Sequence, residues 1–187
     1  TFGDAATDNV ELLVGDVTLA IAGTTTFKSE LDGNFDLIMN NGAGDVSFLA
    51  DVGKTAAIGD GAGEAIEWKT TNTGTTTFAN GKVLKTASGL TSGANTGKIS
   101  FLGDVTLGNG DTHTSFANAA IELSGMTFTS SHATDNVTFG DAVTDNVELL
   151  VGDVTLAIAG TTTFNSDLDG NFDLIMNNGA GNVSFLA

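Results

Sequence analysis

Oxygen-bearing side chains occupy every second position in one short segment of the sequence. These residues are Glu30, Asp32, Asn34 and Asp36. Carboxylate and amide oxygens at alternate positions are typical of a calcium-binding loop, because Ca²⁺ is a hard cation that prefers oxygen ligands. The segment therefore predicts a calcium site.

A second segment repeats this pattern with Asp167, Asp169, Asn171 and Asp173. In both segments the glycine stands at the fourth position rather than the sixth, and no closing glutamate follows, unlike the best-known calcium loop. An acidic turn between two strands is therefore the alternative interpretation of both segments.

The remaining composition offers little to catalysis. The chain has no cysteine and no arginine, and its basic side chains are six lysines and two histidines. Thiol catalysis and zinc–thiolate sites are excluded. Polysaccharide lyases, which use basic groups to neutralise a uronate, are poorly matched. Paired carboxylates could still serve glycoside hydrolysis. We expect no enzyme, no catalytic residues and no cofactor other than calcium.

The charge of the chain limits its partners. Its 187 residues carry a formal net charge of -17, with 41% hydrophobic and 16% charged residues. Such a chain can bury a core, but it repels phosphate backbones and anionic lipid headgroups. It has no apolar run of the length that spans a bilayer. We expect neither a nucleic-acid partner nor membrane insertion of this segment.

The elements that would position these side chains belong to a long repeat. Residues 1–50 return as residues 138–187 with only four differences: Ala6/Val143, Lys28/Asn165, Glu30/Asp167 and Asp45/Asn182. Near-identity over this length indicates tandem duplication. Residues 1–137 are therefore read as one full period and residues 138–187 as the start of the next, within a longer array.

Weaker similarities recur inside the period. Gly23–Phe27 returns as Gly74–Phe78, and this and other similar pairs are separated by offsets of 51, 53, 55 and 88 in residue number. If the unit has about 27 residues, the offsets of 51, 53 and 55 are two units, the offset of 88 is three units and the whole period is five units. A unit of about 20 residues fits almost as well. Either unit is too short to bury its own core, so neighbouring units must stack.

The local pattern is that of β-strands. Apolar residues alternate with polar or small ones in residues 16–23, 35–40 and 46–51, which is the period of a strand with one buried face. Between them lie turn dipeptides that tolerate positive φ, such as Asn41-Gly42, Asn80-Gly81 and Asn178-Gly179. We expect little or no helix.

A stacked repeat of short strands predicts a parallel β-helix, or β-solenoid. Propeller blades are longer than the repeat unit, and a sandwich gives no reason for an internal repeat. In a solenoid, equivalent strands of successive coils lie about 4.8 Å apart, so like side chains form ladders. The Thr-Thr-Thr-Phe segments would place threonines outside and phenylalanines inside.

Two segments carry a family resemblance. Asp45–Gly59 and Thr73–Val83 resemble the pattern G-D-V-T-F-x-G-x-V-G followed by G-T-T-T-F-x-G-x-V. That pattern belongs to giant bacterial surface proteins with β-strand repeats, which are similar to filamentous-haemagglutinin-type adhesins. Leu49, Ala50 and Asn80 depart from it. The resemblance implies an extracellular, cell-surface β-solenoid stalk or filament with a role in adhesion, and supplies no catalytic residues.

Three functions are compatible with the sequence. The first is a repeat segment of an extracellular bacterial fibre or giant adhesin, the second a calcium-binding surface-layer or matrix module, and the third a carbohydrate-active β-helix enzyme. Open strand edges would allow end-to-end association with further copies. Outward apolar residues, Leu13, Ile38 and Leu49, would allow lateral association. Host surfaces, neighbouring-cell surfaces and glycans are the other candidate partners.

Overall fold

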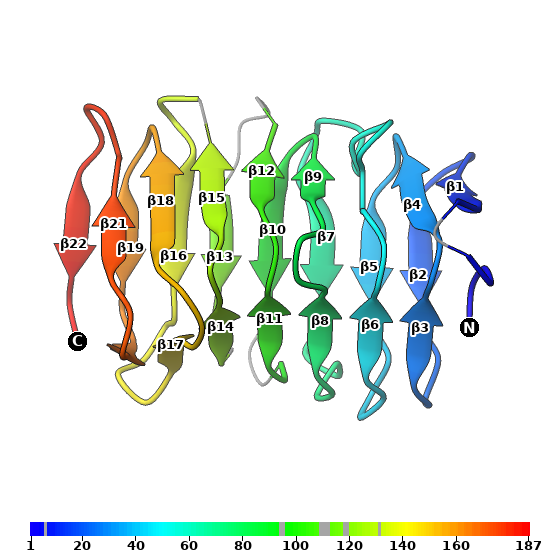
Figure 1. Cartoon of the computed structure of the whole chain (residues 1–187), viewed down its shortest axis with the longest axis horizontal. Helices are drawn as coiled ribbons and strands as arrows, with labels where there is room; N and C mark the ends of the chain where they lie inside the picture. The colour runs from blue at the N-terminus through cyan, green and yellow to red at the C-terminus, as the bar shows by residue number, and fades with distance from the viewer. Residues whose placement is uncertain (6, 94–95, 109–112, 118–119, 131) are drawn as a thin grey trace.

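The chain winds into a stack of short strands arranged on three faces. The computed structural model describes residues 1–5, 7–93, 96–108, 113–117, 120–130 and 132–187. Within those residues there are 22 strands and no helix. All the strand pairings among them are parallel and join neighbouring coils, as Figure 1 shows. The prediction of an all-β parallel β-helix is therefore confirmed.

Each face is a ladder of strands from successive coils. Face I contains β3 (Thr25–Phe27), β6 (Val46–Phe48), β8 (Thr76–Phe78), β11 (Ile99–Phe101), β14 (Ile121–Leu123), β17 (Asn146–Leu149) and β20 (Asp167–Gly170). Face II contains β1 (Asn9–Leu12), β4 (Glu30–Gly33), β9 (Leu84–Thr86), β12 (Val105–Leu107), β15 (Thr127–Ser130), β18 (Val154–Ile158) and β21 (Leu174–Met176). Face III contains β2 (Val17–Leu19), β5 (Leu37–Met39), β7 (Glu64–Trp68), β10 (Gly89–Ser92), β13 (His113–Phe116), β16 (Asn136–Phe139), β19 (Thr162–Phe164) and β22 (Val183–Phe185).

The chain visits the faces in the fixed order I, II, III. Face II is completed by Val52, which bridges Leu31 of β4 to Leu84 of β9. The coils differ in length, because the coil from Phe48 to Phe78 is longer than the coil from Phe27 to Phe48. The longer coil holds the extra loop 53–57 on face II. Loops at the corners therefore absorb changes in length without disturbing the ladders.

Phenylalanine stacks run through the core, as the Thr-Thr-Thr-Phe pattern predicts. On face I the stack is formed by Phe2, Phe27, Phe48, Phe78 and Phe101. On face III it is formed by Phe116, Phe139, Phe164 and Phe185. Ring centroids of neighbours lie between 4.6 and 5.6 Å apart, within the range of favourable offset stacking.

The two stacks meet at an edge-to-face contact. Phe101 on face I and Phe116 on face III have ring centroids 5.6 Å apart and planes inclined by 62°. Phe128 on face II makes edge contacts with Phe101 and Phe139. The aromatic core is thus continuous while its main stack passes from one face to another.

The threonines of the repeated segments divide between the inside and the outside. Thr25, Thr76 and Thr162, each two residues before a stacked phenylalanine, are buried. The threonines on either side of each of these three are half-buried or exposed on the outer surface. The prediction that the threonines lie outside is therefore wrong for the middle one, because the alternation of the strand turns it inward. The alternation in residues 16–23 also predicts an inward-pointing Ile21, and this is wrong, because Ile21 lies beyond the end of β2 and is exposed.

Glycines at the corner between faces III and I allow the coils to approach closely. A Cβ on Gly74 would lie 2.3 Å from the carbonyl oxygen of Gly44, and one on Gly97 would lie 2.2 Å from that of Gly74. Only glycine fits at such distances. Much of the glycine excess therefore serves contact between coils.

The long repeat is not a whole number of coils. Between β1 and its copy β17 the chain advances by sixteen strands and the bridge at Val52, which makes seventeen face positions. Seventeen is one short of a multiple of three, so the second copy lies one face away from the first: Phe27 is on face I and its copy Phe164 on face III. The period is therefore five and two-thirds coils, which is neither the five units expected from a repeat of about 27 residues nor a whole number of units of about 20.

Candidate functional site

The first predicted calcium segment lies where the chain leaves face II. Glu30 and Asp32 belong to β4, on either side of the inward-pointing Leu31. Asp32 is buried beneath the loop that follows Val52, and its Oδ1 accepts the backbone N–H groups of Thr55 (3.0 Å) and Ala56 (3.1 Å). Asp32 thus anchors the extra loop of the next coil.

Asn34 and Asp36 lie beyond the strand. Asn34 is exposed, and the backbone N–H of Asp36 donates to Oδ1 of Asp16 in the preceding coil. Partial burial, together with the charges of Asp16, Asp60 and Glu64, raises the pKa of Asp36. Asp16, Asp60 and Glu64 lie at or just before the start of the neighbouring strands of face III, so their negative charges disfavour the charged form of Asp36.

The second predicted segment lies at the C-terminal end of the stack. Asp167 and Asp169 lie in β20 and are exposed, as are Asn171 and Asp173. The N–H of Asp173 donates to Oδ1 of Asp153, which repeats the contact between Asp36 and Asp16. Asp169 lacks the loop that covers Asp32, because its coil is the last of the stack in this chain.

Among the described residues, no group of three or more histidine, aspartate or glutamate side chains is placed to hold a metal ion. The amide oxygens of Asn34 and Asn171 are ligands of another type, so calcium binding by the two segments stays a prediction.

Acids that the alternating pattern did not single out have a structural role. An aspartate or asparagine precedes a valine at the start of many strands, and its Oδ1 accepts a backbone N–H from the next coil. The bonds join Asp16 to Asp36, Asp45 to Thr75, Asp51 to Val83, Asp104 to Thr127, Asn136 to Thr161 and Asp153 to Asp173. These corner latches explain why Asp-Val recurs, and the recurrence itself was the available signal.

Two acids, the latch Asp51 and the outward Glu122, are held in the ionised form. Burial would raise the pKa of Asp51, but the Lys54 ammonium and the N–H of Val83 outweigh it, so the pKa is lowered. Burial likewise opposes ionisation of Glu122, yet hydrogen bonds from Lys98 and Ser100 lower its pKa. The carboxylates of Asp51 and Glu122 therefore take part in hydrogen bonds and ion pairs of the fold.

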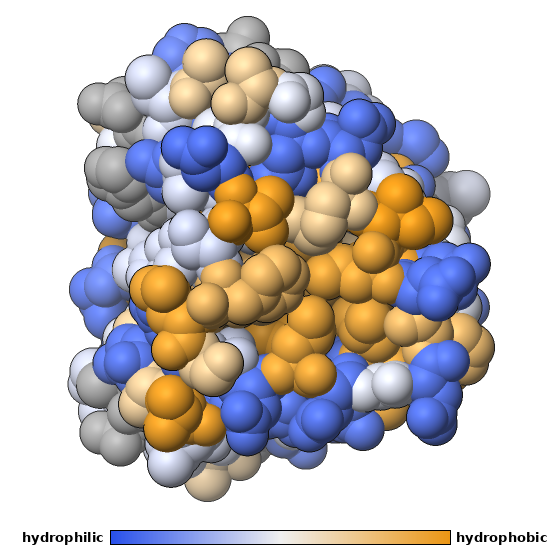
Figure 2. Space-filling view, turned by 90° about the vertical axis from the view of Figure 1, so that its left-hand side faces the viewer, coloured by the Kyte–Doolittle hydropathy of each residue, from blue (hydrophilic) through white to orange (hydrophobic). Residues whose placement is uncertain are grey.

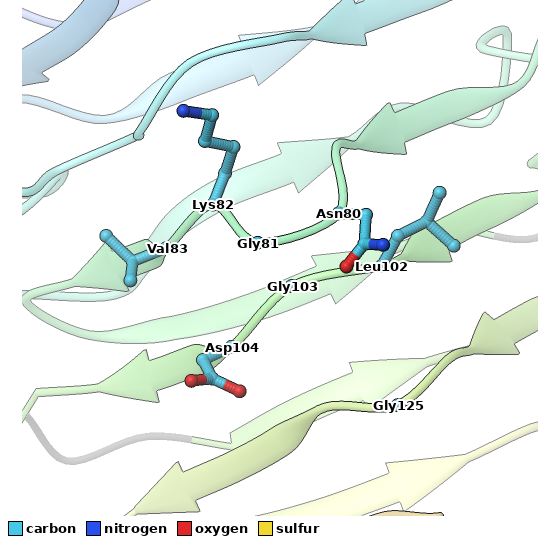
Figure 3. A pocket seen from close by; sticks show the side chains of 8 residues that line it. All are labelled: Asn80, Gly81, Lys82, Val83, Leu102, Gly103, Asp104 and Gly125. Atoms are coloured by element: carbon cyan, nitrogen blue, oxygen red, sulfur yellow. The ribbon is translucent and has the colours of Figure 1, made fainter. Parts of the chain in front are cut away.

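A hollow of about 170 Å³ lies at the corner between faces I and II. Figure 3 shows its floor formed by the backbone at Gly81, Gly103 and Gly125 of three successive coils, with Lys82 extending away from Asp104. Oδ1 of Asp104 accepts the N–H of Thr127 at 2.8 Å. The lining provides one carboxylate that is already hydrogen-bonded, not the pair that glycoside hydrolysis requires.

Leu13, Ile38 and Leu49, which would form an outward apolar stripe, lie on three different faces. Leu13 and Leu49 are exposed and Ile38 is half-buried. Leu13 follows β1 on face II, Ile38 lies in β5 on face III, and Leu49 follows β6 on face I. They therefore point in three directions around the solenoid.

Comparisons with known proteins identify no relative of the chain. No family model matches it, and neither the curated proteins nor the solved structures include a significant match. No helix among the described residues is long and apolar enough to cross a membrane.

Proposed function

We propose that the chain is a repeat segment of an extracellular bacterial fibre or giant adhesin. The observation that carries the proposal is the double placement of one sequence. Equivalent residues of 1–50 and 138–187 lie on different faces, yet residues such as Phe27 and Phe164 are buried alike. A sequence that tolerates either placement serves the lattice of the solenoid rather than one unique site.

The geometry gives such a fibre its dimensions. Strands of successive coils lie about 4.8 Å apart, so five and two-thirds coils advance the axis by about 27 Å per period. Because each period begins one face away from the last, three periods return to the starting face after seventeen coils. Any surface feature of the repeat would then face outward on all sides of the fibre, where neighbouring-cell surfaces or glycans could bind it.

Labelling of intact cells tests this function. An antibody raised against the folded chain should label the outside of unpermeabilised cells of the source organism and decorate filaments in electron micrographs. Labelling only after permeabilisation would exclude a cell-surface role.

A calcium-binding surface-layer or matrix module is the second candidate. It is favoured by two carboxylate oxygens, Oδ2 of Asp32 and Oε1 of Glu30, which are buried and have no hydrogen-bond partner among the described residues. A cation that binds the folded state must raise its stability. Melting with millimolar calcium and with a chelator should therefore differ, and the difference should vanish in Asp32→Ala if this site binds the ion.

A further inference from the structure

The C-terminal end of the solenoid exposes the inside of a coil. The last strands on the three faces are β20, β21 and β22. Figure 2 looks onto this end and shows an apolar centre with a largely hydrophilic rim. Phe185 is 56% exposed and Val183 36% exposed, although both continue ladders whose earlier members are buried.

The same surface occurs a second time inside the molecule, where it is covered. Residues 31–50 are identical to residues 168–187 except for Asp45 in place of Asn182. The strands of this internal copy, β4, β5 and β6, are covered by Val52, β7 and β8. Phe48, the equivalent of Phe185, is 1% exposed beneath Phe78. The coil that covers the internal copy therefore shows what fits the surface at the C-terminal end.

We propose that the surface formed by β20, β21 and β22 is a docking surface for a coil with the sequence of residues 51–78. Transferring the internal pairings places Val52 of that coil against Leu168, Trp68 against Met176 and Phe78 against Phe185. The occupant would thus extend all three ladders. The inference rests on the proposed fibre and deepens it, since a tandem array would supply this coil.

The polar groups of the end surface match the same occupant. Asp169, the exposed equivalent of Asp32, would receive the N–H groups of Thr55 and Ala56. Asn182 would receive the N–H of Thr75, as Asp45 does, because an amide oxygen accepts as a carboxylate does.

A cation of the occupant also fits the acidic rim. In the internal copy Lys54 has a raised pKa, chiefly through Asp51, with contributions from Glu30 and Asp32. On the end surface Lys54 would lie beside Asp167 and Asp169, the equivalents of those last two acids. The occupant therefore brings its own positive charge to the acidic edge of β20.

The exposed edges of β20 and β22 carry further backbone hydrogen-bond donors. In the internal copy the N–H groups of Leu31 and Val46 donate to the carbonyls of Asp51 and Thr75 in the covering coil. The equivalent donors on the end surface are those of Leu168 and Val183. Hydrogen exchange at these two amides therefore reports directly on docking.

The first experiment uses a fluorescently labelled peptide of residues 51–78 and the 187-residue chain. We expect saturable binding by fluorescence anisotropy, weakened about tenfold or more by Phe185→Asp in the chain, since a central aromatic anchor is lost. Phe2→Asp, at the opposite end of the solenoid, is the matched control and should leave binding unchanged. Equal binding by the Phe185→Asp chain, or loss of binding only with Phe2→Asp, would overturn the proposal.

The second experiment extends the chain after Ala187 by a copy of residues 51–78. Amide exchange at Leu168 and Val183 should slow relative to the unextended chain. Slowing supports docking even if the free peptide binds weakly, because the free peptide must lose conformational entropy. Unchanged exchange would refute docking whether or not cells display the protein as a fibre, so the two proposals fail separately.

A competing occupant is the first coil of a second copy, formed by Phe2, β1 and β2. It predicts that the unextended chain assembles end to end as its concentration rises, and that Phe2→Asp abolishes both this assembly and protection of Val183. That result, measured by sedimentation and exchange together, would count against the 51–78 coil.

Discussion

The two copies of the fifty-residue segment share a sequence but not an environment. In the first copy, β4, β5 and β6 lie between two other coils, whereas their equivalents β20, β21 and β22 form one end of the stack. Phe48 is 1% exposed and Phe185 is 56% exposed. Burial in a solenoid is therefore decided by which coils lie on either side, not by the strand alone.

Local contacts, in contrast, are the same in the two copies. The N–H groups of Asp4 and Ala5 donate to Oδ2 of Asp8 in the first copy, and the same turn recurs at Asp145 in the second. The side-chain amide of Asn41 donates to Thr25, and that of Asn178 donates to Thr162. Short-range structure is thus the same in both copies, although equivalent residues lie on different faces.

The largest predicted difference between the copies concerns the aromatic stack. Phe48→Ala should lower the free energy of unfolding by about 3–5 kcal/mol, because it opens a cavity in a fully buried site. Phe185→Ala should lower it by less than about 1 kcal/mol, because the ring is already half in solvent. Urea denaturation measures both, and equal losses would contradict the importance of the covering coil.

The next difference concerns Asp32 and its copy Asp169. Asp32→Ala should cost about 1–3 kcal/mol, since it leaves two backbone donors of the covering loop without their acceptor. Asp169→Ala should change stability by about 0.5 kcal/mol or less, as at other exposed positions. Urea denaturation of both variants in a chelator excludes a contribution from calcium, and a larger cost at Asp169 would reverse the comparison.

A smaller difference concerns pH. The pKa of Asp36 is raised from 3.8, so its contribution to stability is present below that pH and is lost as pH rises through the folded-state pKa. Asp36→Asn should therefore raise the urea midpoint at pH 7 but not at pH 3. Asp173→Asn is the matched control, because this chain places no equivalents of Asp60 and Glu64 beside Asp173. A gain at pH 3 as large as at pH 7 would rule out charge repulsion as the cause.

The smallest effect is expected for a substitution that the second copy already contains. Asp45→Asn reproduces the residue of the second copy, and its amide oxygen can still accept the N–H of Thr75. Stability should change by about 0.5 kcal/mol or less, whereas Asp45→Ala should cost about 1 kcal/mol. Thermal melting compares them, and a large loss with asparagine would show that the latch requires a charge.

The alternation of residues was sufficient to predict the strands and much of the core. Val46, Phe48 and Ala50 are buried as the period-two pattern requires. Ile21 was predicted wrongly, because the pattern continues past the residue at which the chain turns the corner. The offsets of 51 and 53 correspond to two coils, as from Phe27 to Phe78 on face I, whereas the offset of 55 leads from β7 on face III to β14 on face I and is not a whole number of coils.

The acidic pattern was less informative about its own role. Alternating oxygens in residues 30–36 are compatible with a calcium loop, but a sequence pattern does not show that Asp32 lies under a loop of the following coil. The recurring Asp-Val pairs were visible, and their acceptor role was not, because their donors belong to the next coil.

The sequence by itself determined the β-solenoid class, the inward phenylalanines and the near-exact duplication, since these follow from local periodicity and identity. Only the tertiary structure decided the phase of the repeat. The lengths of the coils are set by corner loops, which leave no periodic trace in the sequence. The long repeat therefore spans five and two-thirds coils, and equivalent residues of its two copies lie on different faces.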